Sequence, residues 1–167
     1  MGWISPTSFE DPDSAWANEG NAYDNNTATT ASTTANNHVL ILILASATNS
    51  DKLQFWVNSG YTLTSTLWIF YDGDWHQVYS GVSAKGQWVE VAYAEGTKSI
   101  SKIKYLGNNA PFTDRPVYLY ELQVNEVAGG ATYTKGSSLV NTMTEMLNSK
   151  MLFSACNRFP KLTTRRF

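Results

Sequence analysis

The sequence is poor in the residues from which metal centres and nucleophilic active sites are usually built. Its 167 residues include one cysteine, Cys156, and two histidines, His38 and His76. A single cysteine excludes an internal disulfide and a multi-cysteine zinc site. Asp72 and Asp74 flank Gly73. Aspartate and glycine are common turn residues, so this pair of carboxylates is explained without a catalytic role. We interpret both histidines as rim residues and expect a protein that is not an enzyme.

Charge is also scarce, and it is unevenly placed. Charged residues make up 16% of the chain, against roughly 25% in an average globular protein. The formal net charge of −2 gives no electrostatic support to nucleic-acid binding. Residues 1–126 carry a formal charge of −7, whereas residues 127–167 carry +5. This asymmetry indicates two parts with different roles.

Long apolar runs are missing as well. The longest is VLILILA at residues 39–45, and an α-helix needs ~20 apolar residues to span a bilayer. The N-terminus, MGWISPTSFEDP, has no basic region followed by an apolar run. We therefore expect a soluble protein that is made in the cytoplasm without a signal peptide and has no membrane partner.

What the chain has in quantity is β-type patterning. Apolar or alternating runs, separated by Gly, Asn and Asp turns, occupy residues 38–44, 52–58, 65–71, 87–93, 99–107 and 116–127. Asp72-Gly73 predicts a tight hairpin between two of these runs. The pattern predicts an all-β sandwich over residues 1–127, with 38–44 buried on both faces. Trp56, Trp68 and Trp88 are predicted to pack in its core.

A Gly/Ser-rich linker at residues 128–138 ends this pattern. Beyond it, apolar residues recur at helical spacing and predict an amphipathic helix followed by a basic tail. We predict that residues 139–167 form an assembly element that docks on its own sandwich or on a neighbouring subunit. The predicted interface comprises Leu139, Met143, Met146, Leu147, Met151, Phe153, Phe159, Arg165, Arg166 and Phe167.

Two segments carry a resemblance to a known family. NAYDNNTATTAS at residues 21–32 and YLYELQVNE at residues 118–126 resemble the two ends of a galactose-binding-like jelly roll. This is the discoidin, or coagulation-factor C-type, family, which includes many carbohydrate-binding modules. YDGDWHQVYSG and GQWVEV in between are similar to paired strands of that family. The resemblance covers residues 3–127 and implies a jelly-roll β-sandwich.

The resemblance also implies a structural calcium ion between the two segments. A hard cation takes six to eight oxygens, which a tight Asx-rich loop can supply together with carboxylates. The family places Gly after the aspartate, where this chain has Asn25, a residue that tolerates a left-handed backbone. The alternative is a loop closed only by its own Asx hydrogen bonds. The implied calcium ligands are Ala22, Asp24, Asn26, Thr29 and Glu121.

Loop aromatics are the candidates for binding a sugar. In the sugar-binding modules that this chain resembles, the ligand site is built on loops at one end of the sandwich. Tyr61 lies in the loop-like stretch NSGYT, and Phe112 lies in GNNAPFTDR. The candidate glycan-binding residues are Tyr61, Asn108, Asn109, Phe112 and Arg115.

Two functions follow from these features. The first is a non-catalytic structural or attachment protein of a virion, such as a phage capsid decoration or tail protein, with other subunits as homo- or hetero-oligomeric partners. The alternative is a glycan-binding module that recognises cell-surface or polysaccharide sugars. We place assembly first because carbohydrate modules of secreted enzymes normally accompany a signal peptide or a catalytic domain. The sequence therefore predicts a protein that is incorporated into a virion.

Overall fold

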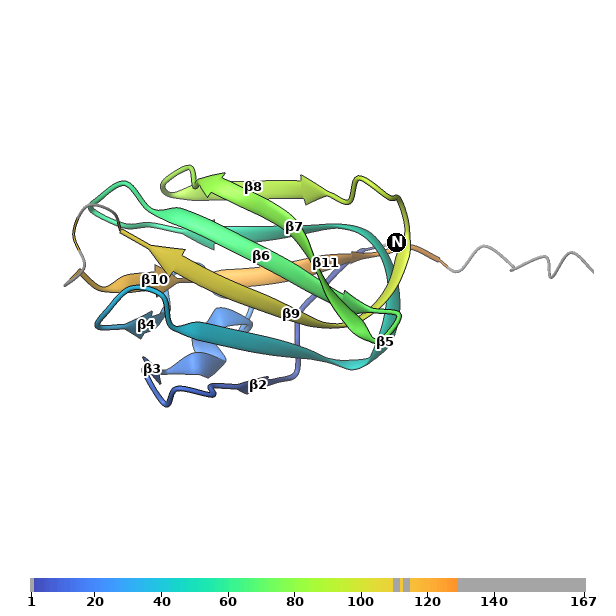
Figure 1. The fold of residues 1–167 in the computed structure, drawn as a ribbon, viewed down its shortest axis with the longest axis horizontal. Coiled ribbons are helices and arrows are strands. Elements are labelled where there is room, and N and C mark those ends of the chain that lie inside the picture. The colour runs from blue at the N-terminus through green and yellow to red at the C-terminus, as the bar shows by residue number, and fades with distance from the viewer. Residues whose placement is uncertain (1, 110–111, 113–114, 129–167) are drawn as a thin grey trace, which may run out of the picture. The chain divides into compact units, whose positions relative to one another are not determined.

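The computed structural model describes residues 2–109, 112 and 115–128, and these residues form an antiparallel β-sandwich (Figure 1). The predicted helix, the linker and the predicted assembly interface lie outside them, apart from the linker's first residue. No helix in the described part of the chain is long and apolar enough to cross a membrane. The elements are β1 (Gly2–Ile4), β2 (Ser8–Glu10), β3 (Trp16–Ala17), the 3-10 helix η1 (Glu19–Ala22), β4 (Ala31–Thr33), β5 (Val39–Val57), β6 (Thr64–Tyr71), β7 (Asp74–Val82), β8 (Gln87–Ala92), β9 (Lys98–Asn108), β10 (Val117–Leu119) and β11 (Glu121–Glu126).

Strand β5 joins the two layers of the sandwich. The sequence pattern predicts two separate runs here, but the structure has one strand with a register shift between Ile43 and Thr48. Its first half pairs with β2 and β9, and its second half pairs with β8 and β11. Figure 1 shows β5 curving around one end of the sandwich. Such a bend lets one strand serve two layers.

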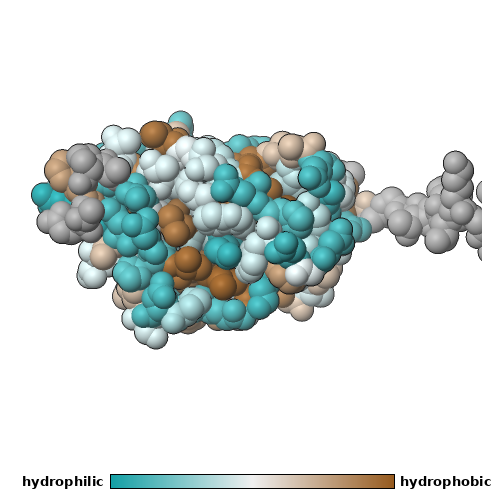
Figure 2. Space-filling view, viewed as in Figure 1, coloured by the Kyte–Doolittle hydropathy of each residue, from teal (hydrophilic) through white to brown (hydrophobic). Residues whose placement is uncertain are grey.

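The core follows the alternation of the strands. Leu40, Leu42 and Leu44 of β5 are buried, whereas the residues between them are half-buried. The prediction that residues 38–44 are buried on both faces is therefore wrong, because the outer face of this layer meets solvent. Figure 2 shows hydrophobic residues exposed on that face, over β5 and β9.

The predicted core positions of three tryptophans are also wrong. Trp56, Trp68 and Trp88 are all half-buried. Trp56 and Trp88 pack edge to face on adjacent strands, with ring centroids 5.6 Å apart. Trp68 lies on the outer face with the Lys104 ammonium 5.3 Å from its ring centroid. The alternation of each strand places these rings on its outer face, where they pack against side chains of neighbouring strands.

The predicted hairpin at Asp72-Gly73 is confirmed. Both residues have positive φ, at 51° and 85°, as the two-residue turn that suits the twist of antiparallel strands requires. The turn joins β6 to β7. It lies at the end of the sandwich opposite the loops between β5 and β6 and between β7 and β8 (Figure 1). We call the end with the β5–β6 and β7–β8 loops the first end of the sandwich, and the end with this turn the second end.

Candidate functional site

Three of the predicted glycan-binding residues meet at the end of the sandwich that carries the β5–β6 loop. Tyr61 follows β5 and Phe112 follows β9, and their ring centroids lie 5.4 Å apart. The Arg115 guanidinium carbon lies 4.9 Å from the Tyr61 centroid and 5.7 Å from the Phe112 centroid. A cation held over two ring faces is electrostatically favourable. The structure therefore brings together three residues from Tyr61 to Arg115, a span of 54 positions in the chain.

These side chains border an open depression. It measures about 460 Å³ and is lined by Tyr61 and Phe112 together with Val82, Ser83 and Lys85. Among the described residues, four large apolar side chains are exposed, and three of them, Tyr61, Val82 and Phe112, line this depression. We call Tyr61, Val82, Phe112 and Arg115 the loop surface. Clustered exposed apolar side chains mark interaction sites more often than single ones do.

Asparagines hold this end in place. The Asn109 backbone N–H donates to Asn36 Oδ1 at 2.9 Å, and Asn109 Nδ2 donates to the Pro116 carbonyl at 2.6 Å. Asn36 Nδ2 donates in turn to the Phe112 carbonyl at 2.7 Å. Asn109 is fully buried, so it supports the loop from within instead of facing a ligand. Asn108 bonds to the Asn37 side chain at 3.1 Å.

The second predicted site is the N-terminal loop, residues 22–29, which the structure brings against Glu121. Asp24 Oδ1 accepts from the Asn26 N–H at 3.0 Å, and Asp24 Oδ2 accepts from the Thr29 hydroxyl at 2.7 Å. Glu121 Oε2 accepts from the same Asn26 N–H at 3.2 Å. Asn25 has a φ of 61°, which confirms that it accommodates the left-handed turn. Ala22 is buried at the end of η1.

Glu121 is buried, and no basic side chain of the described residues pairs with it. Its side chain is 0% exposed, and burial raises its pKa from the ordinary 4.5 to about 7, because a low-dielectric site disfavours the charged form. The backbone N–H groups of Asn26 and Asn25 and the Ser5 hydroxyl bond to the carboxylate and oppose this rise of the pKa. The nearby Asp24 carboxylate adds to it. The site would therefore gain from a positive charge.

The N-terminal loop supplies oxygens of the type that a hard cation binds. In this structure the Thr29 hydroxyl donates to Asp24 Oδ2 at 2.7 Å and to the Asn26 carbonyl oxygen at 2.9 Å. The described residues contain no cluster of three or more His, Cys, Asp and Glu side chains. Carbonyl and hydroxyl oxygens would therefore have to complete the shell that Asp24 and Glu121 begin.

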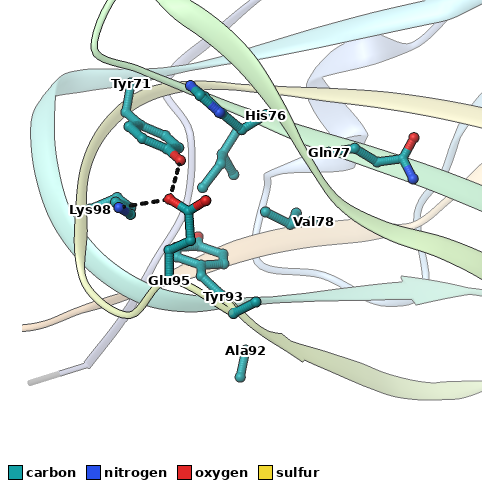
Figure 3. Close-up of a pocket in the computed structure, with 10 residues that line it drawn as sticks. Tyr71, His76, Gln77, Val78, Ala92, Tyr93, Glu95 and Lys98 are labelled. Carbon is teal, nitrogen blue, oxygen red and sulfur yellow. Dashed lines mark hydrogen bonds and ion pairs between the residues drawn. The ribbon is translucent and has the colours of Figure 1, made fainter.

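The structure contains a third site, which the sequence does not predict. At the second end, β6, β7 and the turn after β8 enclose a small pocket (Figure 3). Tyr71, Glu95 and Lys98 line it, and none of these was singled out from the sequence. His76 was interpreted as a rim residue, but its ring stacks on Tyr71 with centroids 3.8 Å apart. The alternation of β6 and β7 could have placed Tyr71 and His76 on the inner face, but only the fold adds the β8–β9 turn.

The sandwich is similar to solved structures of other proteins, although comparison of the sequence finds no match. No protein-family model matches the sequence, and no curated protein matches it. Solved structures do match. The CBM32 module of AlyQ, in complex with 4,5-unsaturated mannuronic acid, is 17% identical with a TM-score of 0.61, over 76% of this chain and 100% of that one. The family 32 module of NanJ from C. perfringens, in complex with galactose, is 16% identical with a TM-score of 0.59, over 73% and 96%.

A third similar structure extends the comparison beyond sugar complexes. An F5/8 type C domain from Bacteroides fragilis is 13% identical with a TM-score of 0.57, over 74% of this chain and 96% of that one. The three structures share their two-layer arrangement with this sandwich at identities that indicate the fold alone. The chain has the galactose-binding-like jelly-roll fold of the CBM32 and F5/8 type C modules.

Proposed function

We propose that this chain is a non-catalytic glycan-binding module that contacts its sugar through the loop surface. One observation carries the proposal. Three of the four exposed large apolar side chains in the described part of the chain line one open depression, beside the guanidinium of Arg115. Sugar rings present apolar C–H faces and a rim of hydroxyls, so a site with aromatic faces and fixed hydrogen-bond donors suits them.

The similar structures support this choice over the predicted virion role. Two of them are carbohydrate-binding modules whose bound ligands are a uronic acid and galactose. Nothing in the described residues or in these structures indicates a virion component. Residues 139–167, the predicted assembly element, lie outside the described residues. The virion role, its location in a capsid or phage tail, and the assembly interface therefore stay predictions.

The proposal also gives the N-terminal loop a supporting role. We propose that calcium, held by Asp24, Asn26, Thr29 and Glu121 with the carbonyl of Ala22, fixes this loop to β11. Calcium supplies positive charge beside the buried carboxylate and performs no chemistry on the sugar. Because this loop and the loop surface share no residue, loss of calcium is expected to lower stability more than it lowers sugar affinity.

A matched pair of substitutions tests the sugar site. The full chain is first applied to a glycan array, and affinity for the best ligand is then measured by calorimetry for wild type, Phe112→Ala and Phe9→Ala. Phe112 and Phe9 are similarly exposed, at 43% and 39%, but Phe9 lies on β2. We expect Phe112→Ala to weaken binding by roughly tenfold or more and Phe9→Ala to leave it unchanged.

Two outcomes would contradict the proposal. One is the absence of any bound glycan from an array that includes acidic and neutral polysaccharides. The other is equal loss of affinity in both variants, which would indicate a general effect on the fold. Equal midpoints of thermal unfolding in the two variants confirm that affinities are compared between intact sandwiches.

A further inference from the structure

A pocket with an unusual lining lies at the end of the sandwich opposite the loop surface. It measures about 130 Å³. Its lining includes the apolar side chain of Val78 and the mostly apolar ring of Tyr93, together with the polar side chains of His76, Glu95 and Lys98 (Figure 3). Ile69, which is buried, also lines it. We call it the Tyr71 pocket, after the ring that lies beside both His76 and Lys98. A cavity of about 150 Å³ holds a six-membered ring such as benzene, so this pocket has room for one small ring, and the hydroxyls of a larger ligand would extend out of its mouth.

Glu95 organises the rim of the pocket. One of its oxygens, Oε2, accepts from the Tyr71 hydroxyl at 2.8 Å and pairs with Lys98 Nζ at 2.9 Å (Figure 3). These contacts lower the pKa of Glu95, the bond from Lys98 most of all, so the carboxylate is charged at neutral pH. Its second oxygen, Oε1, accepts no hydrogen bond from the described residues. A fixed acceptor therefore stands at the mouth of the pocket.

The His76 ring forms part of the pocket lining and stacks on Tyr71. Its Nε2 atom is buried and has no hydrogen-bond partner among the described residues. A buried polar atom without a partner costs free energy, roughly 1–3 kcal/mol. The strand pairing steps from Leu67–Tyr79 to Trp68–Gln77, which leaves Val78 as a bulge residue beside His76. Bulges are common where a strand redirects a side chain toward a site.

We propose that the Tyr71 pocket is a second ligand site that binds one hydroxyl-bearing six-membered ring, such as a single sugar unit or a cyclic polyol. The balance of charge favours this ligand class over ions. Lys98 and Glu95 neutralise each other at the rim, and Asp72 stands near both Tyr71 and Lys98. An anion would face the Glu95 carboxylate, and a cation would face the Lys98 ammonium. Hydroxyls, in contrast, can donate to Glu95 Oε1 while the ring of the ligand lies against the apolar part of the lining.

The proposal is independent of the loop surface. The eight-residue strand β6 separates the two sites, and at 3.3 Å per residue this is roughly 25 Å. No residue lines both the Tyr71 pocket and the depression of the loop surface. One bound ring cannot touch both, so each site can be tested while the other stays intact.

The test is a two-dimensional amide NMR titration of the full chain with D-galactose and, separately, with myo-inositol. We expect saturable shifts of the amides of residues 75–78 and 93–98 with at least one probe. Glu95→Gln keeps the shape of the side chain and removes its charge. It is expected to weaken the response at the pocket on the order of tenfold, which corresponds to one weakened hydrogen bond.

Further variants separate the pocket from the loop surface and from misfolding. Ala94 lies exposed at the pocket, so Ala94→Leu should block the mouth without disturbing the core. Phe112→Ala should leave the pocket response unchanged. The proposal is overturned if neither probe shifts these amides, or if Ala94→Leu and Glu95→Gln respond as wild type does. A pocket response without any glycan binding at the loop surface would refute the proposed function and leave this inference standing.

Discussion

Glu121 and Glu95 lie in two polar regions of one sandwich, and the surroundings change their pKa values in opposite directions. Glu121 is fully buried beneath the N-terminal loop, and desolvation raises its pKa to about 7. The Glu95 side chain is 66% exposed, and the bonds from Lys98 and Tyr71 lower its pKa. The difference lies in the partners: Glu121 is held by neutral N–H and hydroxyl donors, whereas Glu95 has a cation beside it.

The two regions differ in whether the charge of the carboxylate is balanced. Neutral donors satisfy the hydrogen bonds of Glu121 but do not balance its charge, so the N-terminal loop is suited to a cation. The charge of Glu95 is already balanced at the Tyr71 pocket, so that region is suited to a neutral polar ligand. The same type of side chain thus indicates two different ligand classes, and three experiments test this difference.

The largest expected effect is the pH dependence caused by Glu121. Without calcium, its folded pKa of about 7 exceeds the ordinary 4.5, so the folded state binds the proton more tightly than the unfolded state does. This stabilisation is present below pH 4.5 and is lost as the pH rises to 7. The loss of unfolding free energy is up to about 3 kcal/mol. Urea unfolding in a chelator at a series of pH values measures it.

Glu121→Gln provides the control for that slope. Glutamine keeps the shape of the protonated acid and does not titrate, so stability should no longer fall between pH 4.5 and 7. A wild-type protein whose stability is flat over this range would show that the carboxylate is not buried as described. The same slope in Glu121→Gln would assign the effect to another group.

The next effect in size comes from adding calcium. At pH 8, where Glu121 is ionised, saturating calcium should raise the unfolding free energy by about 2–3 kcal/mol and abolish the pH slope. Asp24→Asn should reduce this gain because it removes one charge from the oxygen set. Magnesium, which demands a tighter octahedral shell, should stabilise less. Unchanged thermal unfolding with calcium would leave the loop closed by its own Asx hydrogen bonds.

The smallest effect on stability is expected at Glu95. Its ion pair with Lys98 is exposed, so Glu95→Gln should change the unfolding midpoint at pH 7 very little. The direction is the reverse of that at Glu121, since a lowered pKa contributes stability above pH 4.5 that is lost on acidification. Glu90→Gln is the matched control, because Glu90 is also exposed and pairs with Lys52 at 2.8 Å. A large destabilisation by Glu95→Gln, without one by Glu90→Gln, would show that the contacts of Glu95 with Tyr71 and Lys98 serve mainly to stabilise the fold.

Much of the fold was open to prediction from local patterns. Asp72-Gly73 forms the expected hairpin, and Asn25 adopts the left-handed turn that the resemblance required. The segments around Asp24 and Glu121, almost a hundred residues apart, meet as expected. Burial was harder to predict, because an apolar run such as 38–44 does not reveal which of its faces a second layer covers. The three strand tryptophans were misplaced for the same reason.

Local sequence patterns are sufficient to predict the β-sandwich, its turns and the residue types of the loop surface, because alternation and turn chemistry act over a few neighbouring residues. The folded structure was needed to show that Tyr61, Phe112 and Arg115 meet, that Asn109 is buried, and that Glu95 and His76 line one pocket. These contacts depend on the register between strands and on how one long strand bends between two layers. Periodicity specifies which side of a strand a residue occupies, but the packing of distant strands specifies what it meets there.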